Sequence, residues 1–91
     1  MRQKEIEESL NLILIQIAEL QERIWDEIQA LEEGGRLTPE LERFAAEVMR
    51  DVSFWMDQCI TASESPPILL RRMEVHKARL AKIEELIRHM S

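Results

Sequence analysis

The sequence predicts an all-α protein, an antiparallel up-down-up three-helix bundle with long heptad-patterned helices that dimerises. Apolar residues recur in steps of three and four along most of the chain, as on one face of a helix. The two glycines and three prolines cluster at two places and divide the 91 residues into three segments. Sustained three-four spacing favours shallow crossing angles, and short connections make neighbouring helices antiparallel. We therefore expect a single helical domain over residues 1–91.

The first predicted helix covers about residues 3–33. Gly34 and Gly35 end it, because glycine readily adopts the left-handed backbone conformation found at helix C-termini. The apolar series of this helix consists of Ile6, Leu10, Ile13, Ile17, Leu20, Ile24, Ile28 and Leu31.

The second and third predicted helices cover about residues 38–62 and 66–90. Thr38 is a good N-cap, and Pro39 suits the first helical position because its missing N–H has no partner there. A polar segment closed by two prolines separates these helices, and Ser65 can cap the third one. The apolar series are Leu41, Ala45, Val48, Val52, Trp55 and Cys59 in the second helix, and Leu69, Met73, His76, Leu80, Ile83, Ile87 and Met90 in the third.

Composition indicates a cytoplasmic protein. Cys59 is the only cysteine, so an intrachain disulfide is impossible, which suits a reducing compartment. The first residues turn acidic at once and lack the apolar core of a signal peptide. The aliphatic-rich segment of residues 10–17 is interrupted by Asn11 and Gln16 and is far shorter than the roughly 20 residues of a membrane-spanning helix. The net charge of −6 argues against binding to nucleic acid or anionic lipid.

Charge is divided unequally among the three segments. Residues 1–33 hold nine acidic and three basic side chains, whereas residues 66–91 hold six basic and three acidic ones. One interpretation is that the third helix packs beside the first and that their opposite charges set the topology. The other is that the basic third helix binds an acidic partner.

Leu12 and Ile15 are the main candidates for a contact surface. At about 100° per residue they point away from the apolar arc of the first helix, and residues three apart touch on a helix surface. An apolar spot with an acidic rim is typical of a partner-binding surface. The alternatives are that another part of the chain covers both residues or that they are tolerated exposed residues. The rim consists of Glu5, Glu8, Glu19 and Asp26.

Phe54 is a further outward-facing apolar candidate, on the second helix. It lies opposite the apolar arc, among Arg43, Glu47, Arg50 and Thr61. An isolated exposed phenylalanine needs no explanation. Together with Leu12 and Ile15, however, it favours a second interface, because aromatic residues often anchor such surfaces.

Gln21 and His76 are polar residues within apolar arcs. A polar group in a helix seam can fix register or oligomeric state, but Gln21 also suits the solvent edge of its arc. His76 lies among Met73, Leu80 and Ile83, where burial favours the neutral imidazole. We expect a core histidine bonded to a side chain of the first or second helix, and a pH-sensitive contact is the alternative.

The sequence predicts no enzyme, cofactor or metal site. A di-iron bundle needs Glu-x-x-His on two helices, but Met73 and Leu86 occupy the positions three before the two histidines. Cys59 lies in an apolar series and is expected to act as a small hydrophobic residue. Phosphate-binding glycine loops and nucleophile motifs are absent from the sequence.

The sequence therefore favours a non-enzymatic protein–protein interaction module: an adaptor, a small regulator or inhibitor, or a subunit of an assembly. It would act by helix-face docking, as a homodimer of six helices. The alternative is RNA binding through a basic face of the third helix, since basic side chains gathered on one arc can follow phosphates. That face would consist of Arg71, Arg72, Arg79 and Lys82.

Overall fold

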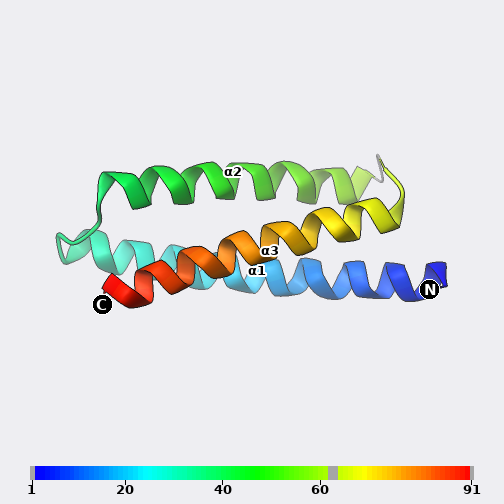
Figure 1. The fold of residues 1–91 in the computed structure, drawn as a ribbon, viewed down its shortest axis with the longest axis horizontal. Helices are drawn as coiled ribbons and strands as arrows, with labels where there is room; N and C mark the ends of the chain where they lie inside the picture. Colours follow the sequence, from blue (N-terminus) through cyan, green and yellow to red (C-terminus); the bar gives the residue numbers. More distant parts are fainter. Residues whose placement is uncertain (1, 62–63, 91) are drawn as a thin grey trace.

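The computed structural model describes residues 2–61 and 64–90 and shows an all-helical protein. The described residues form three α-helices and no strand: α1 (Gln3–Glu33), α2 (Pro39–Thr61) and α3 (Pro66–Met90). Figure 1 shows α2 running back along α1, and α3 crossing in front of α1 while running in the same direction as α1. The Cα atoms extend over 48 × 19 × 15 Å, because the long helices lie nearly along one axis. The all-helical prediction is confirmed.

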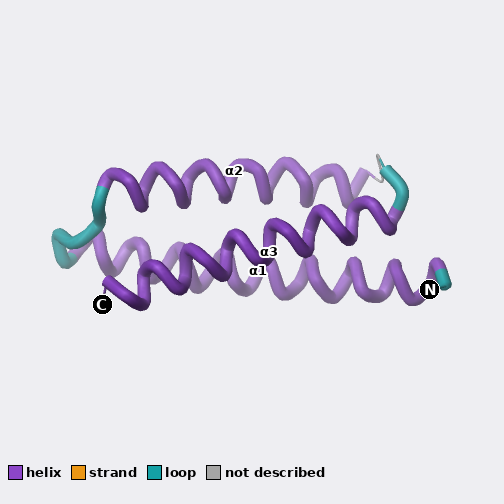
Figure 2. Tube along the Cα trace, viewed as in Figure 1, coloured by secondary structure: helices purple, strands orange, loops and turns teal. Residues whose placement is uncertain are grey.

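Helix α3 is the centre of the packing. It contacts α1 along most of its length and α2 over a shorter stretch, whereas α1 and α2 touch each other at few positions. Figure 2 shows the three helices joined by short connections at opposite ends of the molecule. The predicted packing of the third helix beside the first is therefore present. None of the three described helices is long and apolar enough to cross a membrane.

The core follows the three-four series expected from the sequence. Ile17, Ile24 and Val48 have no exposed surface. Trp55 and Cys59, near the end of the α2 series, are partly buried and pack against the core. The other fully covered side chains at the centre are Val52, Met73, Leu80 and Ile83.

The helix ends are fixed by local hydrogen bonds. Gly35 has a φ of 69°, and the Arg36 N–H donates to the Leu31 carbonyl oxygen at 2.8 Å, which closes α1 with a Schellman motif. Thr38 caps α2, because its Oγ1 accepts from the Leu41 N–H at 3.2 Å, so the helix begins at Pro39, one residue later than expected. The expected end of this helix, at residue 62, lies outside the described residues.

Candidate functional site

Leu12 and Ile15 lie on the outer face of α1. Their side chains are 56% and 57% exposed, so no described part of the chain covers them. The acidic side chains expected around them, including Glu8 and Glu19, are exposed as well. The structure thus places an apolar pair within a negatively charged rim on the surface of α1.

Leu12 also borders a hollow of about 450 Å³ between α1 and α3. Small side chains, Ala78 and Ala81, form part of its α3 wall. Lys77 Nζ donates to Gln16 Oε1 at 2.7 Å and ties the two helices together beside this hollow. Because the hollow is open to solvent at an exposed leucine, it is a surface depression rather than part of the core.

Phe54 lies at a different seam from Leu12 and Ile15. Its ring is 55% exposed and meets the ring of Trp55 edge-on, with centroids 5.5 Å apart. Trp55 in turn carries the guanidinium of Arg72 over its ring, 4.7 Å from the centroid. Phe54 therefore borders the α2–α3 seam, and the structure does not join it to the pair on α1.

The four basic candidates on α3 have different surroundings. Arg72 stacks on Trp55, and Arg79 Nη1 lies 3.1 Å from Asp51 Oδ2 of α2, so both are held at the α2–α3 seam. Lys82 is exposed and lies 4.0 Å from Glu85. Arg71 is exposed and borders a hollow of about 380 Å³ with Ile68 and Val75. Of these four, Arg71 and Lys82 are exposed without a contact to α2, and the ion pair of Lys82 stays within its own helix.

His76 is buried in the α2–α3 seam, with 6% of its surface exposed. Its Nδ1 lies 3.5 Å from Arg79 Nη1, and because arginine only donates, Nδ1 is the acceptor and the proton sits on Nε2. Burial, and then the charge of Arg79, lowers the pKa of His76, while Asp51 acts in the opposite direction. The hydrogen-bond partner comes from the same helix, so the expected bond to the first or second helix is wrong. Arg79 instead links the imidazole to α2.

Gln21 lies half-buried where α1 faces α2. Its Nε2 donates to the sulfur of Met49 at 3.6 Å. A thioether is a weak acceptor, so this contact holds the amide in place with little energy. Gln21 thus joins two helices that touch at few other positions.

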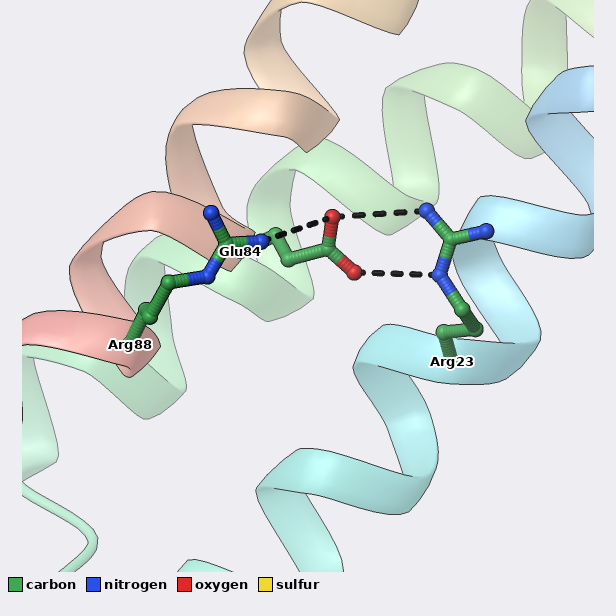
Figure 3. Close-up of polar contacts among 3 residues, drawn as sticks. All are labelled: Arg23, Glu84 and Arg88. Atoms are coloured by element: carbon green, nitrogen blue, oxygen red, sulfur yellow. Dashed lines mark hydrogen bonds and ion pairs between the residues drawn. The ribbon is translucent and has the colours of Figure 1, made fainter. Parts of the chain in front are cut away.

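An ion cluster joins α1 to α3 (Figure 3). Arg23 donates from Nε and Nη2 to the two carboxylate oxygens of Glu84, at 3.1 and 3.3 Å, and Arg88 Nη2 lies 3.8 Å from the same group. Burial, together with the charge of Glu84, raises the pKa of Glu27. Arg23 is a basic residue of the mostly acidic α1, and Glu84 is an acidic residue of the mostly basic α3. The overall charge difference between the two helices therefore does not explain this ion pair.

Four exposed apolar residues were given no functional role from the sequence: Trp25, Ile60, Ile68 and Val75. Trp25 is 57% exposed and borders a small hollow with Met49. Its position on the flank of the α1 apolar arc, beside Ile24, is the signal that could have identified it. Ile60, at the end of α2, is 79% exposed, because the core does not extend that far.

The described residues show little that would support covalent chemistry. No group of three or more His, Cys, Asp or Glu side chains among residues 2–61 and 64–90 is placed to hold a metal ion. Burial raises the pKa of the Cys59 thiol, which disfavours the reactive thiolate. The surface features of this part of the chain are therefore apolar contacts and charges.

Comparisons with known proteins give no relative. No family model matches the chain, and no curated protein or solved structure is significantly similar to it.

Proposed function

We propose that the protein is a non-enzymatic protein–protein interaction module, an up-down-up bundle that works as a homodimer by docking the outer face of α1. The observation that carries this proposal is the exposure of Leu12 and Ile15, at 56% and 57%. Both are large aliphatic side chains, and they are neighbours on one helix face. A stable monomer gains nothing from keeping this pair in water.

The energy of such docking has a clear source. Complete burial of a leucine or isoleucine side chain is worth about 1.5–3 kcal/mol. Leu12 and Ile15 each keep more than half of their surface in water, so covering both contributes favourably to association. The acidic rim then selects a partner surface that carries positive charge.

The role of Phe54 in this proposal is a second contact region at the α2–α3 seam. Its exposed ring meets the ring of Trp55 edge-on, so the two side chains together offer an aromatic surface. Adaptors, small regulators and assembly subunits all use surfaces of this kind.

Mass in solution tests the proposal. The double variant Leu12→Glu/Ile15→Glu places two charges within the apolar pair and should shift the protein from dimer to monomer, as measured by light scattering after size-exclusion chromatography. The matched control, Gln29→Glu/Ala30→Glu, adds the same charge at exposed positions of α1 that lie more than three turns from Ile15, and it should leave the mass unchanged. Identical masses for the wild type and both variants would overturn the proposal.

A further inference from the structure

The seam between α1 and α2 is the least packed of the three helix seams. The two helices run antiparallel (Figure 1) and touch at few positions, whereas α3 packs against both of them. One of the contacts across the seam, from Gln21 to Met49, joins an amide to a thioether and is weak. In a four-helix bundle, a fourth helix packs against such a pair and completes the core. The fold therefore leaves room for a further helix along the α1–α2 seam.

Apolar side chains line this seam over about three turns of α1. Leu14, Met49 and Met56 pack against the core but are only half-buried. Trp25 is 57% exposed. Leu14 and Met56 each lie seven residues, or about two turns, from the contact between Gln21 and Met49. Because the helices are antiparallel, these two residues lie at one level. We call the surface formed by Leu14, Trp25, Met49 and Met56 the α1–α2 groove.

One end of the α1–α2 groove deepens into a hollow of about 160 Å³ beside Trp25. Apolar side chains from both helices line it, including Ile28, Ala45 and Met49. An apolar cavity of about 150 Å³ is large enough to hold benzene. The hollow therefore accepts one aromatic or large aliphatic side chain of another molecule.

The rim of the α1–α2 groove is acidic. Glu32 and Glu42 border the hollow, one from each helix. Glu22 lies three residues before Trp25 and is its neighbour on the surface of α1. The three glutamates are exposed, and none of them forms an ion pair with another described residue. The groove therefore favours a partner with positive charges beside its apolar side chains.

We propose that the α1–α2 groove binds a basic amphipathic helix of a partner protein, which takes the position of a fourth helix in the bundle. The apolar side chains of that helix recur in steps of three and four and cover the groove, and one of them enters the hollow beside Trp25. Its lysines and arginines face the acidic rim. Methionine side chains are flexible, so Met49 and Met56 adapt to the residues that cover them. The groove lies on a different side of α1 from Leu12 and Ile15, so this inference does not depend on the homodimer.

A synthetic peptide tests this arrangement. The probe has about 18 residues, long enough to form a helix, with leucines in steps of three and four and lysines elsewhere. A matched peptide carries glutamate in place of lysine. In the variant Trp55→Phe, Trp25 is the only tryptophan, so its fluorescence reports on the groove. The lysine peptide should cover the indole and move its emission to shorter wavelength, and the glutamate peptide should leave the emission unchanged.

A first pair of variants locates the binding site by shape. Ala46 is exposed and borders the hollow, so Ala46→Arg places a long cationic side chain there. The dissociation constant of the lysine peptide, measured by fluorescence anisotropy of a labelled peptide, should rise about tenfold or more. Ala30 is exposed as well but borders α3, so the control Ala30→Arg should leave the constant unchanged.

A second pair of variants tests the charge of the rim. Glu32→Gln/Glu42→Gln should raise the dissociation constant of the lysine peptide about threefold or more. The control Glu40→Gln/Glu47→Gln removes the same charge from exposed positions of α2 that lie outside the groove, and it should have the smaller effect. Circular dichroism checks that all variants remain helical.

The outcomes separate this inference from the proposed function. The inference is overturned if the lysine peptide does not bind at about millimolar concentration. Equal binding of the glutamate peptide, or an equal effect of each variant and its control, overturns it as well. If Ala46→Arg dissociates a dimer that Leu12→Glu/Ile15→Glu leaves intact, a second copy fills the groove, and both proposals are wrong. If the lysine peptide still binds to Leu12→Glu/Ile15→Glu, the groove acts separately from the self-association face, as inferred.

Discussion

The inner and outer faces of α1 are made of the same residue types but have different surroundings. Ile13 and Ile17 on the inner face are 7% and 0% exposed, whereas Leu12 and Ile15 on the outer face are more than half exposed. The inner residues contribute to the core shared with α2 and α3. Aliphatic side chains of one helix therefore have two different roles. Those on the inner face stabilise the fold because the rest of the chain covers them, and those on the outer face are available for association because it does not.

The largest expected effect separates the two faces by stability. Ile17→Ala removes a side chain with no exposed surface and should lower the free energy of unfolding by about 2–5 kcal/mol. Ile15→Ala should change the free energy of unfolding of the monomer by less than about 0.5 kcal/mol. Urea denaturation at a concentration where the protein is monomeric measures both. Equal losses would show that the two faces do not differ as described.

A second pair of like residues, at the end of α1, extends the comparison. Gly35 has a φ of 69°, so Gly35→Ala should cost about 1–2 kcal/mol of stability. Gly34 has a φ of −82°, and an added Cβ would lie 3.5 Å from its nearest neighbour, an ordinary contact. Gly34→Ala should therefore be neutral or stabilising by up to about 1 kcal/mol. Thermal unfolding measures the stability of both variants. A smaller loss of stability in Gly35→Ala than in Gly34→Ala would contradict the difference expected from the two backbone conformations.

The smallest expected effect concerns pH and the two histidines. The pKa of His76 is lowered in the fold, so below its ordinary value of about 6.5 the unfolded chain binds more protons. Stability is therefore full above that pH and falls as the pH drops below it. His76→Gln should reduce the loss of unfolding free energy between about pH 7.5 and about pH 5.5, the range that brackets this ordinary value.

The exposed His89 provides the control for this pH effect. His89→Gln should keep the wild-type loss of stability over the same range. If His76→Gln also keeps the full loss, the buried imidazole is not its source.

The sequence was sufficient to predict the three helices and their inward faces, because three-four spacing specifies direction around each helix. It also identified Leu12 and Ile15 as outward-facing, since they lie opposite a continuous apolar series. It did not distinguish the flanks of a helix. Trp25 lies on such a flank, where exposure depends on how closely α2 approaches.

The partners of polar side chains were also beyond the sequence. His76 was expected to bond across helices, but its contact is Arg79, three residues along the same helix. Likewise, Phe54 was grouped with Leu12 and Ile15, whereas it packs against Trp55 at another seam. Both contacts lie within one helix, and the periodicity of the apolar residues does not determine which side-chain conformations bring them together.

The most direct test of the central claim is the mass of the wild-type protein measured by light scattering over a dilution series. Covering the outer face of α1 with a second copy predicts twice the mass of one chain at high concentration and a fall towards the mass of one chain on dilution. A mass of one chain at every concentration would contradict the claim that Leu12 and Ile15 form a self-association surface.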